Sequence, residues 1–220
     1  MAFYRGPNVA TEGLVLALDA ANTKSYPGSG TTWRDMSTNN IIGTLTNGPT
    51  FNSANGGSIA FDGVNDVVLM ADNSALNTQT PSVEVWIKTN ATNQNGFWFE
   101  KGTVNTQYSL FQEGTSIVWR QDARSQYTTT ATYITTTNWA QVIGTYTSGD
   151  RRTYINGILR TSDAQTGAVA TNAGGMFIGT YGGGGYPYNG NVAIVRVYNR
   201  ILSPSEVLQN YNATKTRFGL

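Results

Sequence analysis

The most informative stretch of the chain reads NWAQVIGTYTSGDRRTYINGIL, residues 138–159, and contains two period-two segments with two tight turns. Asn156-Gly157 follows Tyr-Ile and precedes Ile-Leu, and both central residues of a type I′ hairpin turn need positive φ, which Asn and Gly tolerate. Ser148-Gly149-Asp150 supplies the residues of a second turn. The stretch therefore predicts successive antiparallel strands joined by short connections.

The same period-two pattern, bounded by Gly, Asn, Asp and Pro, recurs along the chain. Many short strands with almost no helix between them favour two antiparallel sheets packed face to face. We therefore expect an all-β sandwich with predicted strands at residues 14–19, 58–62, 67–70, 82–88, 108–112, 116–122, 131–134, 139–147, 152–160, 176–181 and 191–199.

A helical pattern occurs near the C-terminus, in SPSEVLQNY at residues 203–211. Ser203 is a favourable N-cap, Pro204 suits the first helical position, and Glu206 completes a capping box. The apolar residues at helical spacing would dock this short helix on the sandwich through Val207, Leu208 and Tyr211.

The length of 220 residues is typical of a single all-β domain, and no repeat or linker divides the sequence. We expect an N-terminal arm at residues 1–12, one sandwich domain at residues 13–213 and a C-terminal tail at residues 214–220.

The composition argues against several classes of function. Charged residues make up 12% of the chain and the formal net charge is +1, so no electrostatic field favours nucleic acid or an anionic membrane. The absence of Cys and His removes disulfides, the usual zinc ligands and the commonest general base. The first residues lack the order of a secretory signal, and no apolar run reaches the about 18 to 20 residues that span a bilayer. We expect a soluble protein without a nucleic-acid or membrane partner.

Five segments in a fixed order carry a family resemblance, namely SIAFDGVNDVV, SVEVWIK, NWAQVIGTYTSGDRRTYINGIL, MFIGTY and NVAIVRVYNRILSPSEVLQNY. Over residues 13–213 the chain resembles the concanavalin A-like jelly roll of laminin-G-like and pentraxin domains. The resemblance implies a two-sheet antiparallel jelly-roll β-sandwich and functions that range from sugar binding to adhesion, assembly and glycan cleavage. The opening GLVLALDAANTKSYPGSGTTWRDMSTNN is similar to modules in virion proteins of tailed bacteriophages.

The resemblance implies that a jelly-roll glucanase carries closely spaced carboxylates on one strand. This chain lacks that pattern. Glycoside hydrolysis needs two carboxyl groups about 5 to 10 Å apart. Glu84, Glu100 and Glu113 each lack a second carboxylate on the same face of their strand. We therefore expect no enzymatic activity and no catalytic residue.

The resemblance also implies calcium in loops at the rim of the sandwich, where Asp, Asn and Glu supply hard oxygen ligands. The corresponding segments, residues 101–108 and 178–190, contain no carboxylate. Asp62, Asn65 and Asp66 could bind an ion, but Asx capping of a turn is the favoured interpretation. No metal and no cofactor is predicted, and a weak calcium site near Asp62 and Asp66 stays open.

The run TYGGGGYPYNG, residues 180–190, lacks the Lys and the following helix of a phosphate-binding loop. Its glycines could form a plain connection between strands, or let the tyrosines lie flat at a protein or glycan contact. Aromatic faces with nearby amides are typical of both kinds of surface. The candidate carbohydrate-binding or interface residues are Tyr181, Tyr186, Tyr188, Asn189, Trp98 and Trp119, whereas Trp86 and Trp139 are assigned to the core.

Together these patterns favour a non-enzymatic virion structural protein, a capsid decoration or other particle-surface module that is made in the host cytoplasm without a signal peptide. The expected partners are other virion or capsid proteins and, in addition, glycans, with a homo-oligomer or multiple copies on a particle. The alternative is a carbohydrate-binding adhesin, either free or on a tail fibre. Attachment arms are predicted at both ends, with Phe3, Tyr4 and Phe218 as their exposed aromatic residues.

Overall fold

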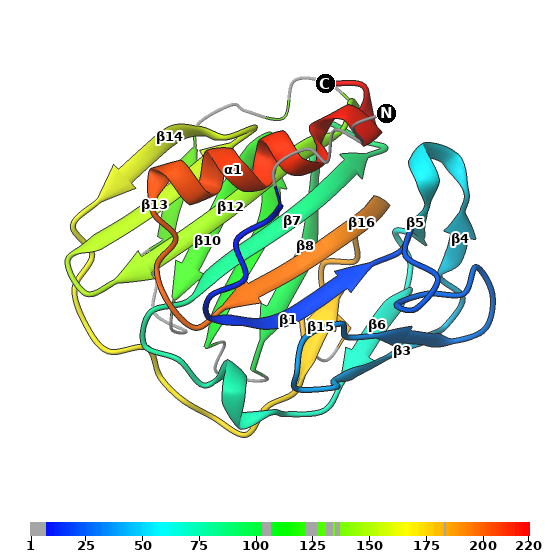
Figure 1. Cartoon of the computed structure of the whole chain (residues 1–220), viewed down its shortest axis with the longest axis horizontal. Coiled ribbons are helices and arrows are strands. Elements are labelled where there is room, and N and C mark those ends of the chain that lie inside the picture. The colour runs from blue at the N-terminus through cyan, green and yellow to red at the C-terminus, as the bar shows by residue number, and fades with distance from the viewer. Residues whose placement is uncertain (1–7, 103–106, 122–126, 131–133, 135–136, 183) are drawn as a thin grey trace, which may run out of the picture.

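The computed structural model describes residues 8–102, 107–121, 127–130, 134, 137–182 and 184–220. In this part of the chain two antiparallel sheets, each 8-stranded, pack face to face (Figure 1). We name them sheet A and sheet B. The predicted fold is confirmed, because the chain forms an all-β sandwich with a short C-terminal α-helix.

Each sheet combines strands from distant parts of the sequence. Sheet A contains, in spatial order, β14 (Ile158–Asp163), β13 (Asp150–Ile155), β12 (Ala140–Thr147), β7 (Ser82–Thr89), β16 (Asn189–Tyr198), β5 (Ser58–Asp62) and β4 (Thr50–Asn52), and β1 (Leu14–Asp19) also pairs with β16. Sheet B contains β11 (Tyr127–Thr130), β10 (Ser116–Gln121), β9 (Tyr108–Gly114), β8 (Gln94–Lys101), β15 (Met176–Ile178), β6 (Val67–Met70), β3 (Ile42–Thr46) and β2 (Thr32–Arg34).

The hairpin of β13 and β14 forms at the predicted turn. Asn156 and Gly157 have φ angles of 51° and 77°, as a type I′ turn requires. The side chain of Asn156 also accepts a hydrogen bond of 2.9 Å from the amide of Gln141. Gly149, between β12 and β13, has a φ of 90°. Both turn predictions are therefore confirmed.

The sheets interlock through a tryptophan of β10. The indole N–H of Trp119 crosses the core and donates to the carbonyl oxygen of Thr145 on β12 at 3.1 Å. Gly144 makes room for this ring, because a Cβ at that position would lie 2.3 Å from an indole carbon. Cores are close-packed, so a side chain at position 144 would push the sheets apart.

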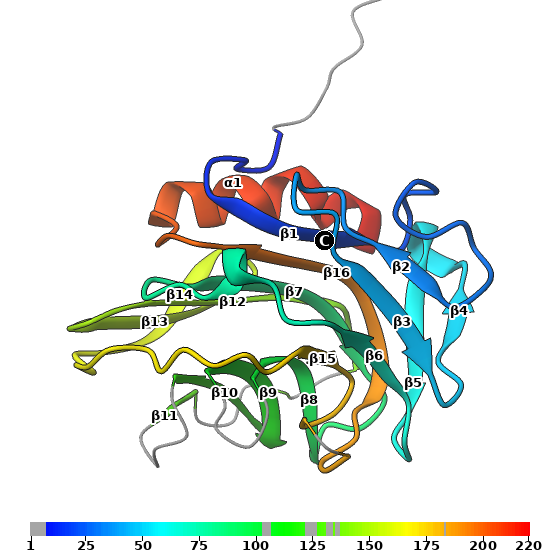
Figure 2. The same ribbon diagram turned by 90° about the horizontal axis from the view of Figure 1, so that it is seen from below.

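Helix α1 (Pro204–Thr214) covers the outer face of sheet A (Figure 2). Of the residues predicted to dock it, Val207 is fully buried and Tyr211 stacks on Trp86, but Leu208 is 47% exposed. The prediction for Leu208 is therefore wrong, because its side chain lies on the solvent side of the helix.

The helix begins with the predicted capping box: the hydroxyl of Ser203 accepts the amide of Glu206 at 3.3 Å, and the Glu206 carboxylate accepts the Ser203 amide at 2.9 Å. Among the described residues, no helix is long and apolar enough to cross a membrane.

A buried polar network lies beneath α1. Glu84 of β7 has no exposed surface, and one of its carboxylate oxygens accepts hydrogen bonds of 2.9 Å from both Arg196 and Gln141. The other oxygen accepts a bond of 2.8 Å from Asn210 on the helix. The network joins α1 to the sheet and leaves Glu84 no access to a substrate.

The residues just before the sandwich are packed against α1. Ala10 is buried, and its amide donates to the side-chain oxygen of Asn210 at 2.8 Å. Ala10, which lies within the arm predicted at residues 1–12, is therefore packed against the fold. Phe3 and Tyr4, the other part of that prediction, lie outside the described residues.

The C-terminal tail is also folded onto the sandwich. The 3₁₀ helix η3 (Lys215–Phe218) brings the Phe218 ring onto Trp86, with centroids 4.2 Å apart and 16° between the planes. Phe218 is only 6% exposed. The prediction of an exposed attachment residue at Phe218 is therefore wrong, because the ring completes the packing over sheet A.

The period-two pattern missed β8, which lies near the centre of sheet B. Its apolar residues Phe97, Trp98 and Phe99 are consecutive, and a β-bulge between Phe97 and Phe99 inserts Trp98 into the strand. Trp98 and Phe99 both belong to the main core, whereas Phe97 belongs to a separate outer cluster. The strand predicted at residues 131–134 falls largely on residues outside the described part.

Candidate functional site

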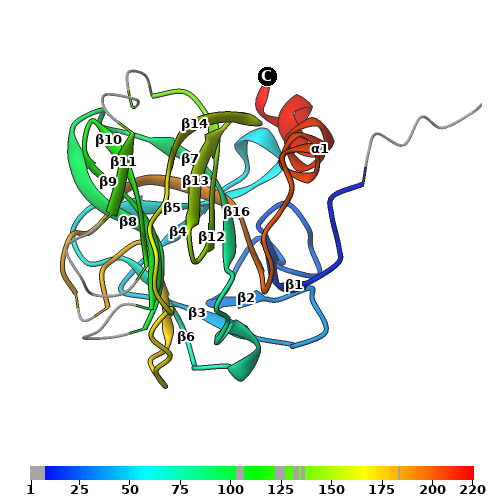
Figure 3. The ribbon, with the colours of Figure 1, turned by 90° about the vertical axis from the view of Figure 1, so that its left-hand side faces the viewer.

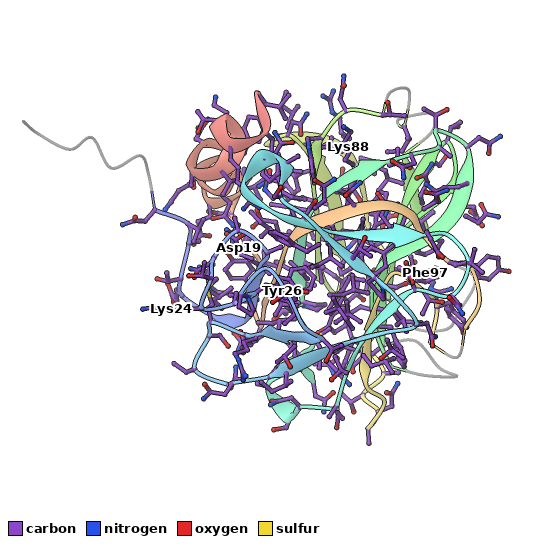
Figure 4. All side chains as sticks on the ribbon, turned by 90° about the vertical axis from the view of Figure 1, so that its right-hand side faces the viewer. Asp19, Lys24, Tyr26, Lys88 and Phe97 are labelled. Atoms are coloured by element: carbon purple, nitrogen blue, oxygen red, sulfur yellow. The ribbon has the colours of Figure 1, made fainter. Side chains whose placement is uncertain are left out.

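The outer face of sheet B carries an aromatic floor formed by β8, β9 and β10. Phe97 pairs with Phe111 across two strands, and Phe111 pairs in turn with Val118. The rings of Phe97 and Phe111 are stacked, with centroids 4.2 Å apart and 5° between the planes. Phe97 lies on the flank of the molecule away from Asp19 and α1 (Figure 4).

The glycine-rich segment between β15 and β16 folds back on itself beside this floor. The amide of Tyr181 donates to the carbonyl of Gly185 at 2.8 Å, and the amide of Gly184 donates to the carbonyl of Tyr181 at 2.9 Å. Gly184 has a φ of 102°, a conformation that glycine adopts without strain. Gly184 and Gly185 therefore belong to a tight turn with Tyr181 on one side and Tyr186 on the other.

Two contacts join this turn to β8. The amide of Phe97 donates to the carbonyl of Tyr186 at 3.3 Å, and the amide of Gly182 donates to the carboxylate of Glu100. A Cβ on Gly182 would lie 2.9 Å from a ring carbon of Phe177, so glycine permits the close approach of the turn to the sheet. The turn is therefore held in one position over the strands.

A cavity of about 370 Å³ opens between the floor and the turn. Tyr186 is 56% exposed and Tyr181 is half-buried, and their ring centroids lie 6.3 Å apart with 79° between the planes. The residues that line the cavity are Asn95, Phe97, Phe111, Gln112, Glu113, Arg120, Tyr181 and Tyr186.

Arg120 of β10 lies at the centre of these aromatic side chains. Its guanidinium carbon is 5.7 Å from the ring centroid of Phe97, 5.3 Å from that of Phe111 and 5.9 Å from that of Tyr181. A guanidinium nitrogen also lies 3.9 Å from the buried carboxylate of Glu100. Cation–π contacts and this ion pair hold Arg120 in a fixed orientation.

Two of the predicted binding residues, Tyr181 and Tyr186, line the cavity. Asn189 lies close by at the start of β16. Its backbone amide donates to the side-chain oxygen of Gln94 at 2.8 Å, and its own side-chain oxygen accepts from the side-chain NH₂ of Asn90 at 2.9 Å. These contacts stabilise the end of the strand. The part that Tyr181 and Tyr186 have in binding stays a prediction.

Three other candidate residues lie in the core. Trp98, Trp119 and Tyr188 each have 0% exposure. The rings of Trp98 and Tyr188 make an edge contact, with centroids 6.3 Å apart and 83° between the planes. Their prediction as surface residues is wrong, because each side chain points between the sheets and fills the space there.

Sequence patterns alone do not reveal most of the aromatic floor or its cation. Phe97, Phe111 and Arg120 belong to three different strands, and the register of those strands brings them together. Alternation in YSLFQ and SIVWRQD does place Phe111 and Arg120 on the outer face. That signal identifies a face of each strand but not the neighbours across the sheet.

Two carboxylates among the described residues, those of Glu100 and Glu113, belong to this face of sheet B. Glu100 is opposite Ser109 on β9, and Glu113 lies four residues farther along that strand. At the rise of a β-strand the backbone positions of the two residues are about 13 Å apart, and Glu100 is fully buried whereas Glu113 is exposed.

The turn at Asp62 and Asp66 has the contacts of Asx capping. A carboxylate oxygen of Asp66 accepts the amide of Asp62 at 2.9 Å, and one of Asp62 accepts the amide of Val64 at 2.8 Å. Burial raises the pKa of Asp66, and the nearby charge of Asp62 raises it further, against the lowering effect of that amide. Among the described residues, no group of three or more Asp, Glu, His or Cys side chains is placed to hold a metal ion.

Solved structures with a similar fold include several proteins that have binding or catalytic functions. The binding domain of botulinum neurotoxin DC, solved in complex with rat synaptotagmin II, aligns with a TM-score of 0.74 and 14% identity. That alignment covers 92% of this chain and 52% of the toxin chain, so this chain spans about half of it. Trypanosoma rangeli sialidase aligns with a TM-score of 0.69 and 15% identity, over 95% of this chain and 34% of the sialidase.

Another similar structure matches along its whole length. Domain 4 of AbnA, a GH43 extracellular arabinanase from Geobacillus stearothermophilus solved in complex with arabinotriose, has a TM-score of 0.70 and 18% identity. The alignment covers 92% of this chain and 100% of that domain. At such identities the likeness is one of fold.

Sequence comparison gives the family directly. No curated protein matches the chain significantly. Residues 62–208, however, match the family described as the concanavalin A-like lectin/glucanases superfamily (Laminin_G_3). The matched range runs from the end of β5 into α1 and includes every strand that contributes to the cavity. The chain therefore belongs to the concanavalin A-like lectin/glucanase superfamily.

Proposed function

We propose that this protein is a non-enzymatic carbohydrate-binding module and that its glycan site is the cavity between the aromatic floor and the glycine-rich turn. The observation that carries the proposal is the grouping of two tyrosines, a stacked phenylalanine pair and a guanidinium around one cavity of about 370 Å³. This volume lies in the range of about 300 to 1,000 Å³ that is usual for small-molecule sites.

The groups around the cavity suit a sugar. The rings of Tyr181 and Tyr186 offer flat apolar surfaces for the C–H face of a pyranose or furanose, and their hydroxyls can donate or accept. The side-chain oxygen of Asn95 accepts the amide of Gly114 at 2.9 Å, and its NH₂ group can donate to a ligand hydroxyl. The exposed carboxylate of Glu113 accepts hydrogen bonds from further hydroxyls.

The structural neighbours support this proposal through glycan ligands on the same fold. Domain 4 of the Geobacillus arabinanase was solved with arabinotriose. A related structure concerns cell entry of botulinum neurotoxin type C through two ganglioside molecules. Glu100 is fully buried and its carboxylate accepts the amide of Gly182, so it is not exposed to a ligand, and this supports binding without cleavage.

The test is a glycan-array screen of the purified protein and of the Tyr181→Ala and Tyr186→Ala variants. We expect binding by the wild type and at least a tenfold weaker signal for each variant, since stacking on an aromatic ring is lost. Leu208→Ala removes an exposed apolar side chain from α1, far from the cavity, and serves as the control. Wild-type levels of binding in both tyrosine variants would exclude the cavity as the site.

We further propose that the module is carried on a virus particle, as a capsid decoration or tail-fibre component. The support is the likeness of the N-terminal segment to bacteriophage virion modules. In the fold, that segment is held by Asp35, whose carboxylate accepts the amides of Ala17 and Ser37 at 2.8 Å and of Ile41 at 3.3 Å. Mass spectrometry of purified particles tests the proposal, and absence of the protein from them would contradict it.

A further inference from the structure

Among the described residues in and beside the cavity, carboxylates outnumber cations. Its described lining residues include one cation, Arg120, and one carboxylate, Glu113. A second carboxylate, that of Glu100, is fully buried and lies 3.9 Å from the Arg120 guanidinium. Two carboxylates against one guanidinium leave the described site with a net negative charge.

Arg120, the one cation among the described lining residues, is poorly placed to bind an anionic ligand. Only 18% of the Arg120 side chain is exposed, and its guanidinium packs against the rings of Phe97, Phe111 and Tyr181. A strong bidentate bond to a carboxylate needs the open fork of a guanidinium, with two parallel N–H groups. Here the nearby carboxylate of Glu100 already compensates the charge of Arg120.

The carboxylate of Glu113, in contrast to the guanidinium of Arg120, is exposed. Glu113 reaches solvent at the cavity wall, on the strand β9 that also carries Phe111. It accepts hydrogen bonds from sugar hydroxyls but repels an anionic group that enters the cavity. Like charges separated by less than a Debye length, about 10 Å at 0.1 M salt, interact significantly.

From this charge arrangement we infer that the site selects uncharged sugars and rejects glycans that carry a carboxylate, such as uronic or sialic acids. The inference rests on the proposed glycan-binding function and specifies the class of its ligand. The aromatic rings bind the apolar face of the sugar, and Glu113 provides the discrimination.

The experiment compares matched pairs of probes by isothermal titration calorimetry at low salt: galactotriose against trigalacturonate, and N-acetyllactosamine against its sialylated form. Within a pair that binds, we expect the acidic member to bind about fivefold to tenfold more weakly. Glu113→Gln should reduce this ratio to about twofold, and so should about 1 M NaCl, which shortens the Debye length to about 3 Å. Glu12→Gln changes the net charge equally at an exposed site distant from the cavity, and should preserve the ratio.

The outcomes separate the two proposals. Equal or tighter binding of the acidic members would overturn the inference and leave the glycan site in place. A ratio unaffected by Glu113→Gln would also overturn it, because the discrimination would then have another source. Absence of binding to both members of every pair, and to the wider array, would overturn the proposed function itself.

Discussion

The outer faces of the two sheets contain the same pair of charges in different surroundings. On sheet A, Glu84 and Arg196 form a bond of 2.9 Å beneath a helix, with further donors to the carboxylate. On sheet B, Glu100 and Arg120 lie 3.9 Å apart, beneath a glycine-rich turn and beside an open cavity. The first pair is enclosed by its own chain, whereas the second borders a space that a ligand can enter.

Aromatic pairs repeat this contrast. Trp86 on sheet A is covered by the ring of Phe218 at 4.2 Å, and the C-terminal segment completes the layer. Phe97 and Phe111 on sheet B also stack at 4.2 Å, but they form the floor of the cavity. The two flanks lie on opposite sides of the sandwich (Figure 3). What covers a β-sheet face, more than its residue types, determines whether it stabilises the fold or remains available for binding.

The largest expected effect is that of Glu84→Ala. It leaves Arg196 buried without its carboxylate, and we expect a loss of about 3 to 5 kcal/mol in the free energy of unfolding. The matched control is Glu113→Ala on the outer face of sheet B, which we expect to cost less than about 0.5 kcal/mol because this side chain is exposed. Urea denaturation measures both, and similar losses would show that the two faces do not differ as described.

Phe218→Ala tests whether the C-terminal segment stabilises sheet A. The ring packs against Trp86 and is 6% exposed, so its removal should cost about 3 kcal/mol. Leu208→Ala, on the exposed side of α1, should cost less than about 1 kcal/mol. A small loss for Phe218→Ala in thermal or urea unfolding would mean that the segment is a tail that the sandwich does not need.

A smaller effect is expected from pH, through the cap of α1. The Arg200 side chain and the Ser203 amide hold the pKa of Glu206 at about 2, below its ordinary value of 4.5. Because the folded-state pKa is the lower one, Glu206 stabilises the fold above pH 4.5, and this stabilisation is lost as the pH falls toward 2. With a quarter of the side chain exposed, we expect about 1 kcal/mol.

The pH prediction is measured by unfolding at several pH values between about 5 and 2. Glu206→Gln lacks the titrating group and should show a smaller decrease in stability over this interval. If wild type and variant decline in parallel, the acid sensitivity of the fold comes from other carboxylates.

The smallest effect on stability is expected at Tyr186, in contrast with Tyr188 two positions away. Tyr186 is 56% exposed, so Tyr186→Ala should change the free energy of unfolding by less than about 0.5 kcal/mol while it weakens glycan binding. Tyr188 is completely buried, and Tyr188→Ala should cost about 3 kcal/mol or more. Equal effects of the two substitutions would contradict the division of this segment into a surface residue and a core residue.

Local signals in the sequence predict much of the fold. The Asn156-Gly157 turn and the capping box of Ser203 each depend on a few adjacent residues, and both form as expected. Strand β8 could not be predicted in the same way, because the bulge at Trp98 breaks the alternation of its side chains. The glycines around Tyr188 predict a surface position for it, whereas its ring turns inward and is fully buried.

The candidate site could be predicted only in part. The glycine run identified Tyr181 and Tyr186, because such a run lets aromatic residues stand at a surface. The contribution of Phe97, Phe111 and Arg120 depends on the register of three strands, and pairing across a sheet is a long-range property. The sequence places each residue on a face, whereas the cavity exists only once the strands are aligned.

The ends of the described chain lie on the side of the molecule that carries α1. The carbonyl of Asn8 accepts a hydrogen bond of 2.5 Å from Gln209 on the helix, and η3 continues directly from α1 toward Leu220. Figure 3 shows this flank opposite β8, β9 and β10. A tether joined at either end, whether to a support, a fused domain or a larger assembly, therefore leaves the cavity facing outward and free to sample its surroundings.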